Sequence, residues 1–239
     1  MNYGIQLFSI RDLTEVNMEN ALQQVAKLGY HSVEFAGFFG NRSATIKEWL
    51  AKYNLQVSGT HTGLLEITEH FQETVAYHKE IGNKLIIIPG ADLSDQMKLD
   101  HFIGMVNMYG PMLEEEGICL AYHNHDHEFK PNADGSIIYD QLLERTSLKL
   151  ELDTYWAYVA GKDPVEMTTK LLPRLVALHI KDGLPDRSGK PLGMGTAPVK
   201  AVYETAVKLN LPLIVESETL TPDGITEARI CIEYLRGLC

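Results

Sequence analysis

The centre of the chain reads Ile118-Cys119-Leu120-Ala121-Tyr122-His123-Asn124-His125-Asp126-His127-Glu128-Phe129. This segment begins with a short apolar run and continues with three histidines at alternate positions. Alternate side chains of an extended chain point to the same face. The segment therefore predicts a buried strand whose carboxyl end presents a row of imidazoles. A lone histidine would most simply be a core residue, but three together favour a metal site, because imidazole is the commonest protein ligand for transition metals.

Strand-like and helical segments alternate on both sides of this segment. Residues 84–90 are apolar on both faces, as a strand covered on both sides must be, and residues 18–28 have apolar side chains at helical spacing. The other expected strands are 3–8, 31–36, 55–60, 148–152, 175–180 and 213–215, and the other expected helices are 44–53, 68–81, 97–116, 137–145, 164–172, 199–209 and 226–235. Eight strand–helix units predict an α/β fold, a single-domain (β/α)8 TIM barrel over residues 1–239.

The composition favours a small-molecule partner. Hydrophobic residues make up 45% of the 239 residues and charged residues 22%, and no apolar run approaches the roughly 20 residues that span a bilayer. A net charge of -11 disfavours nucleic-acid binding. Three cysteines without a CxxC pair, and an N-terminus without a signal-peptide pattern, predict a cytoplasmic protein without disulfides. The sequence leaves open whether the chain forms a homo-oligomer.

Polar residues collect where the expected strands end. These residues are Gln6, Glu34, His61, His123, His125, Glu151, Asp153, His179, Lys181, Glu216 and Glu218. In TIM barrels the active site lies at the carboxyl ends of the strands. Ionisable groups that are buried there must be paired or must hold a metal, because desolvating them alone costs several kcal/mol.

Four of these residues form a coherent ligand set: His123, Asp153, His179 and Glu216, from the fifth to the eighth strand. Two neutral imidazoles and two carboxylates balance the charge of one divalent ion, and this mixture suits Mn, Co, Zn or Fe better than Ca. Such an ion can polarise a carbonyl and stabilise an enediolate that forms when the neighbouring carbon loses a proton. His125 is expected on the same face as His123 and is the alternative ligand.

Several stretches resemble the xylose isomerase-like barrel family, which includes sugar phosphate isomerases and epimerases, keto-inositol dehydratases and endonuclease IV. They are Gly4-Ile5-Gln6-Leu7-Phe8-Ser9-Ile10-Arg11-Asp12, Tyr122-His123-Asn124-His125, Leu152-Asp153-Thr154-Tyr155-Trp156 with Gly161-Lys162-Asp163-Pro164, and His179-Ile180-Lys181-Asp182. The resemblance covers essentially the whole chain and implies one divalent ion at the barrel mouth. Manganese is the preferred ion, with Zn, Co, Fe and Mg as alternatives. By position, the implied ligands are His123, Asp153, His179 and Glu216.

One position departs from the family pattern. Ketose epimerases of the family typically have a glutamate where His123 stands, and they use it with the last-strand glutamate as two opposed proton-transfer groups. Only Glu216 remains here, so a reaction with one principal base is expected. The candidates for a substitute acid are Glu151, His125 and Lys181.

The remaining polar residues at the strand ends are candidates for substrate contact. They are Gln6, Glu34, His61, His125, Lys181 and Trp156, whose indole could form a wall for a sugar ring or pack in the core. Lys181 could equally form a structural ion pair. The loop over residues 187–195 contains three glycines and is interpreted either as a lid or as a long connection.

These observations predict a metal-dependent isomerase or epimerase of a small keto-sugar, polyol or sugar phosphate. The closest alternative is a lyase that removes water from a keto-inositol or keto-sugar at the same site. A hydrolase that resembles endonuclease IV is disfavoured by the net charge of -11. A sugar-binding protein without catalytic activity is the alternative from another class, and binding without a metal would favour it.

Overall fold

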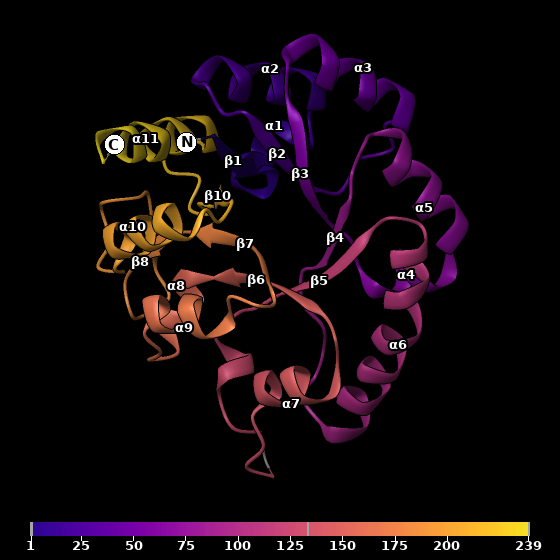
Figure 1. Ribbon diagram of the computed structural model, residues 1–239. Coiled ribbons are helices and arrows are strands. Elements are labelled where there is room, and N and C mark those ends of the chain that lie inside the picture. Colours follow the sequence, from indigo (N-terminus) through magenta and orange to yellow (C-terminus); the bar gives the residue numbers. More distant parts are fainter. Residues whose placement is uncertain (1, 133, 239) are drawn as a thin grey trace.

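Eight parallel strands form a closed barrel with helices around it (Figure 1). The computed structural model describes residues 2–132 and 134–238. The barrel strands are β1 (Tyr3–Gln6), β2 (Ser32–Ala36), β3 (Gln56–His61), β4 (Leu85–Ile88), β5 (Cys119–His123), β6 (Lys149–Asp153), β7 (Leu175–Ile180) and β10 (Leu213–Val215). Sequential strands are neighbours, and β10 closes the barrel against β1. The predicted single-domain TIM barrel is confirmed.

The helices lie outside the strands and cover them. They are α1 (Arg11–Thr14), α2 (Met18–Leu28), α3 (Ser43–Tyr53), α4 (Leu64–Glu69), α5 (Phe71–Glu80), α6 (Gln96–Glu115), α7 (Ile138–Arg145), α8 (Thr154–Val159), α9 (Pro164–Leu171), α10 (Val199–Leu209) and α11 (Gly224–Gly237). Helix α2 shows why such segments begin and end where they do. The Asn17 side chain accepts a hydrogen bond from the Asn20 N–H, and Gly29 ends the helix with a φ of 91°. Among the described residues, none of the helices has the length and apolar character that crossing a membrane requires.

The core fills the space between the barrel wall and the helices. Ile86, Ile87 and Ile88 of β4 are fully buried, which agrees with the strand that was predicted to be covered on both sides. The register of the ladders places polar residues side by side at the carboxyl ends. His123 lies beside Glu151, and Asp153 lies beside the next polar residue, His179. The barrel therefore converts distant positions in the chain into neighbours.

The strand that was predicted to carry the row of histidines ends at the first of them, while the three rings still lie next to one another and His127 and Glu128 lie in a turn, as expected for these two residues. Strand β5 ends at His123, and a 3-10 turn, η2 (His127–Phe129), follows. The cause is Glu128, which is fully buried. One oxygen of Glu128 accepts the backbone N–H of His125 at 2.8 Å, and the other accepts the Tyr122 hydroxyl at 2.7 Å. These bonds turn the chain back, so that the side chain of His127 is half exposed.

Three further expectations differ from the structure in detail. The expected helix 68–81 is two helices, α4 and α5, because His70 between them has φ -129° and ψ 37°. Helix α8 was not predicted. The long loop before α10 contains a small hairpin of β8 (Asp182–Gly183) and β9 (Gly189–Lys190). Asp182 accepts backbone N–H groups of Gly193 and Gly195 at 2.9 and 3.0 Å, so this loop is fastened to the barrel rim.

Candidate metal centre and active-site pocket

Four side chains converge at the carboxyl end of the barrel. His123 of β5, Asp153 of β6, His179 of β7 and Glu216, which directly follows β10, each offer one ligand atom, and these atoms lie within 4.8 Å of one another. All four side chains are buried. The structure therefore brings together the four residues that were predicted to ligate a metal, which we call the outer set.

The ring nitrogens of the two histidines support this set. His123 Nδ1 lies 3.1 Å from Glu151 Oε2, and His123 Nε2 lies 4.0 Å from Asp153 Oδ2. His179 Nε2 lies 3.1 Å from Glu151 Oε2, and His179 Nδ1 lies 3.3 Å from Glu216 Oε2. Histidines that bind metals usually contact a carboxylate through the other ring nitrogen, which fixes the ring. The arrangement leaves His123 Nε2 and His179 Nδ1 on the side of the two carboxylate ligands.

A second group, the inner set, lies beneath the first and shares two histidines with it. It consists of His61, His123, Glu151 and His179. Glu151 Oε2 is its centre, since it lies 2.9 Å from His61 Nε2 and 3.1 Å from a nitrogen of each of the other two rings. Burial lowers the pKa of His61, but Glu34 and Glu151 outweigh it and raise this pKa to about 9. Glu151 Oε2 is already contacted by three imidazoles, whereas Asp153 Oδ2 has no hydrogen-bond partner, so the outer set is the better candidate for a cation site.

Three buried carboxylate oxygens at the carboxyl end of the barrel have no hydrogen-bond partner. Glu34 Oε2, Glu151 Oε1 and Asp153 Oδ2 are buried atoms without a hydrogen-bond partner. Asp153 Oδ1 accepts the Trp156 N–H at 2.9 Å and so caps α8, which leaves Oδ2 toward the outer set. Burial raises the pKa of Asp153 to about 7. Buried carboxylates without a counter-charge are costly, so this surplus fits a divalent ion.

Carboxylates surround the ammonium group of Lys181 at the carboxyl end of the barrel. Its Nζ lies 3.1 Å from Glu216 Oε2 and 2.9 Å from Glu218 Oε1, and only 1% of the side chain is exposed. Burial lowers the pKa of Lys181, but Glu216, Asp153 and Glu218 outweigh it and raise this pKa above its ordinary value. The Lys181 ammonium also lies 4.8 Å from the centre of the Trp156 ring. Lys181 is therefore a fixed positive charge that orients Glu216.

A cavity of about 340 Å³ opens above these groups. Its lining consists of Phe8, Ala36, His61, Pro89, His123, His125, Glu216 and Glu218. His61 and His125, which were predicted to contact substrate, thus lie in the wall of this pocket. The centres of the His125 and His123 rings are 5.2 Å apart, and Nδ1 of His125 is buried without a hydrogen-bond partner. We call this cavity the active-site pocket.

The other predicted substrate contacts lie outside this lining. The Gln6 side-chain amide donates a hydrogen bond to Glu34 Oε1 at 2.7 Å, and the same oxygen lies 2.8 Å from His179 Nε2. Gln6 and Glu34 therefore fix the orientation of the His179 ring. Trp156 is 8% exposed and packs beside Tyr155. Their roles as substrate contacts stay predictions, as does the direct catalytic role of Glu151.

Two contributors to the site were not predicted. Phe8 lies in a 3-10 turn, η1 (Leu7–Ile10), rather than in the first strand, and its half-exposed ring lines the pocket under the Arg11 guanidinium. Asn124 accepts the Asp153 N–H at 3.1 Å and so holds the end of β6 against β5. Both residues lie inside the motifs of the family resemblance, which was the available signal.

A third histidine-rich cluster, His125, His127 and Glu128, is a poor cation site. Its ligand atoms also lie within 4.8 Å of one another. The two oxygens of Glu128 are already bound to the Tyr122 hydroxyl and the His125 N–H. The cluster is therefore a structural anchor for the turn after β5, and this supports His123 rather than His125 as the ligand.

The model of the xylose isomerase-like TIM barrel family matches residues 22–237. The chain belongs to this family. The resemblance found in the sequence motifs is thereby confirmed, and the conserved architecture of the family accounts for the barrel and for the position of the pocket at its carboxyl end.

Relatives in this family carry names from two reaction classes. The inosose dehydratase of Bacillus velezensis is 26% identical over 200 aligned positions, which cover 72% of this chain and 66% of that protein. The chain thus spans just under two thirds of that relative. A sugar phosphate isomerase/epimerase from Parabacteroides distasonis has a TM-score of 0.82 at 23% identity, with 98% of this chain and 92% of that chain covered. The probable 3-DHS dehydratase of Bacillus anthracis has a TM-score of 0.78 at 16% identity, with 98% and 99% covered.

Proposed function

We propose that this chain is a divalent-metal-dependent isomerase or epimerase of a small keto-sugar or polyol, which removes a proton next to a carbonyl. The observation that carries the proposal is the outer set, His123, Asp153, His179 and Glu216, whose ligand atoms lie within 4.8 Å at the base of the pocket. Mn is the preferred ion, with Zn, Co, Fe and Mg as alternatives, because the set mixes imidazole and carboxylate. When bound, the ion would polarise the substrate carbonyl.

Glu216 is the proposed base. It lines the pocket, and although burial raises its pKa, Lys181 and His179 outweigh burial and lower this pKa well below its ordinary value. The carboxylate is therefore ionised and ready to accept a proton. Across the pocket, His125 has an unpartnered Nδ1 and a pKa that burial lowers, so a neutral imidazole is available there to relay a proton.

Glu151 and Lys181 are assigned to positioning rather than to proton transfer. Neither residue lines the pocket, and each is at most 1% exposed. Glu151 Oε2 orients three imidazoles, and Lys181 Nζ holds Glu216 Oε2 at 3.1 Å. Removal of either residue would disturb the ligands and the base without removing a group that touches substrate.

The charge of the pocket favours an uncharged substrate over a sugar phosphate. Its eight lining residues include Glu216 and Glu218 but no lysine or arginine. The ammonium of Lys181 beneath them is already paired with both glutamates. A phosphate dianion would meet like charge here, which is unfavourable at short range.

Dehydration of a keto-inositol or keto-sugar is the second candidate. Two observations favour it: His123 occupies the position where two-base epimerases have a glutamate, and the first curated relatives are named inosose dehydratases. Both reactions begin with the same proton abstraction and differ in whether a hydroxyl group leaves afterwards.

One experiment separates these reactions. The Mn-loaded protein is incubated in D2O with a keto-inositol and, separately, with a ketohexose, and the products are followed by NMR. Isomerisation or epimerisation places deuterium in an intact carbon skeleton, and dehydration yields an unsaturated ketone. Absence of exchange and of product with both compounds, or sugar binding that is unaffected by a chelator, would contradict the proposed function.

The variant Glu216→Gln tests the proposed base. We expect the turnover number to fall by roughly 10³-fold, because general-base catalysis contributes about 10²–10⁴. The exposed Glu204 on α10 supplies the control, since Glu204→Gln makes the same chemical change in a surface ion pair. Near-normal turnover of Glu216→Gln, measured with saturating Mn, would rule out its role as base.

A further inference from the structure

A second hollow lies on the barrel rim beside the active-site pocket, with a volume of about 730 Å³. Its walls come from the segments after β3 and β4 and from the first turns of α6. The apolar groove, as we call it, is formed mainly by Leu64, Leu65, Ala91, Leu93, Met97 and Phe102. Both volumes fall within or near the range of roughly 300–1,000 Å³ typical of small-molecule sites.

The groove and the pocket share a boundary. Pro89 lines the pocket and Gly90 lines the groove, and in the same way His61 lines the pocket and Gly63 the groove. Gly90 has a φ of 150° and no side chain, and a Cβ atom at this position would lie 3.7 Å from Cε1 of the pocket residue His125. Gly90 therefore lies against the pocket residue His125 and presents no side chain of its own at the boundary between the two hollows.

Two of the groove residues are left uncovered by the described parts of the chain, whereas Leu93 and Phe102 are buried. Leu65 is 71% exposed and Met97 is 76% exposed, although both are large apolar side chains. The charges at the rim pair with one another, because Lys98 Nζ lies 2.7 Å from Asp92 Oδ2. The lining is therefore mainly apolar, and its lysine and aspartate are paired, so that His101 is the remaining ionisable group in it; this favours an uncharged apolar group.

We propose that the apolar groove binds an aromatic or alkyl substituent that is attached to the sugar ring in the pocket. The substrate is then an uncharged glycoside or ether whose sugar ring keeps a free ketone, rather than a free sugar or a sugar phosphate. This inference rests on the proposed function for the sugar portion. The ring occupies the pocket of about 340 Å³ beside Glu216, and the substituent crosses Gly90 into the groove.

The test compares the phenyl and the methyl glucoside that carry a free ketone at C3 as ligands of the Mn-loaded protein by calorimetry. We expect the phenyl compound to bind about tenfold more tightly, since burial of the ring adds about 1.4 kcal/mol. Leu65→Asp and Met97→Asp should abolish this preference, and both positions are exposed enough to tolerate the change. Met108→Asp is the matched control, because Met108 is 60% exposed on the same helix α6 but outside the groove.

Each other outcome overturns the inference. Equal or undetectable affinity for the two glucosides shows that the groove does not bind the substituent. A dimer that Leu65→Asp dissociates, with no change in phenyl glucoside affinity, shows that a second copy covers the groove. Neither result touches Mn binding or the turnover of an unsubstituted keto-inositol or ketohexose, so these two measurements distinguish failure of this inference from failure of the proposed function.

Discussion

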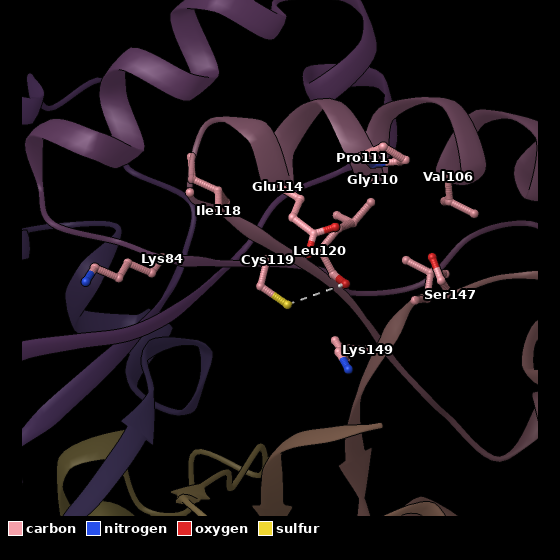
Figure 2. A pocket seen from close by; sticks show the side chains of 12 residues that line it. Lys84, Val106, Gly110, Pro111, Glu114, Ile118, Cys119, Leu120, Ser147 and Lys149 are labelled. Atoms are coloured by element: carbon pink, nitrogen blue, oxygen red, sulfur yellow. Dashed lines mark hydrogen bonds between the residues drawn. The ribbon is translucent and has the colours of Figure 1, made fainter. Parts of the chain in front are cut away.

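The two ends of the same barrel strands carry very different chemistry. Cys119 begins β5 and His123 ends it, and Lys149 begins β6 and Asp153 ends it. At the amino end, Cys119 and Lys149 line a cavity of about 270 Å³ between these strands and α6 (Figure 2). The ionisable groups around that cavity, such as Glu114 on α6, are exposed to water.

At the carboxyl end, the ionisable groups are buried and crowded. Glu34, Glu151, Asp153 and His179 are fully buried, and three of their carboxylate oxygens lack partners. Charges without water cost stability, so a barrel would keep them only where they serve a function. The comparison shows that the same strands carry exposed charged groups at one end and buried, crowded ones at the other, which is where we propose that an ion binds.

The largest expected contrast is between the two ends of β6. Asp153→Asn removes a member of the outer set and a buried carboxyl whose Oδ2 has no hydrogen-bond partner and lies 3.9 Å from Lys181 Nζ. We expect Mn affinity to fall by about 100-fold or more, the upper part of the range for altered metal surroundings. In a chelator, the melting temperature should stay equal or rise, because a neutral amide can still accept the Trp156 N–H and no longer adds negative charge beside Glu216. Calorimetric titration and thermal unfolding measure the two quantities.

Lys149→Gln is the control at the other end of the strand. Lys149 is exposed and lies outside the carboxylate cluster, so neither Mn affinity nor the melting temperature should change appreciably. If Asp153→Asn binds Mn as tightly as the unmodified chain, or if its metal-free form melts at a markedly lower temperature, then Asp153 is structural and the contrast between the two ends fails.

The sequence was sufficient to predict the barrel and the convergence of the four residues of the outer set. Polar residues at or just after the carboxyl ends of the barrel strands must lie at the common rim, so β5, β6, β7 and the residue after β10 bring their side chains to one place. Prediction from the sequence failed where one residue has two structural roles. Asp153 ends β6 and also caps α8 through Trp156, so the change from strand to helix has no loop to mark it.

Contacts between residues that are distant in the chain could not be predicted from the sequence, for a different reason. The alternation of His123, His125 and His127 predicts a continuous strand, but the buried Glu128 folds the chain back after β5. Similarly, which ring nitrogen of His123 meets Glu151 depends on how β5 and β6 are aligned. Such facts follow from packing between strands rather than from spacing along one of them.

A second test compares one glutamate at the carboxyl end of the barrel with one at the amino end. Glu151→Gln removes the charge on the oxygen that lies within 3.1 Å of a nitrogen of His61, His123 and His179. We expect Mn affinity to fall roughly 10–100-fold, the effect usual for groups that orient ligands. Turnover at saturating Mn should recover in part, because Glu216 is untouched.

Glu114→Gln provides the comparison for this test, since Glu114 lines the cavity at the amino end and is exposed. We expect no change in Mn affinity for this variant. Turnover of Glu151→Gln that stays abolished at saturating Mn would favour a part for Glu151 in proton transfer, in line with its place among the candidates for a substitute acid in the sequence analysis. The two titrations are run in the same buffer, because competing ions would alter both affinities.

The smallest expected effect contrasts two buried histidines. Carboxylates surround His61 at the mouth, whereas His78 on α5 contacts the neutral side chains of Thr60 and Asn83, and burial lowers its pKa to about 4. Because this value is below the ordinary 6.5, the unfolded chain binds the proton first, so the contribution of neutral His78 is present above pH 6.5 and is lost as the pH falls toward 4. The chain should lose about 2 kcal/mol more stability than His78→Gln between pH 7 and pH 5 when urea unfolding is measured in a chelator. If the free energy of unfolding falls equally in both proteins between pH 7 and pH 5, then His78 is protonated in the native state without a cost in stability. The two histidines would then not differ in the way that their surroundings predict.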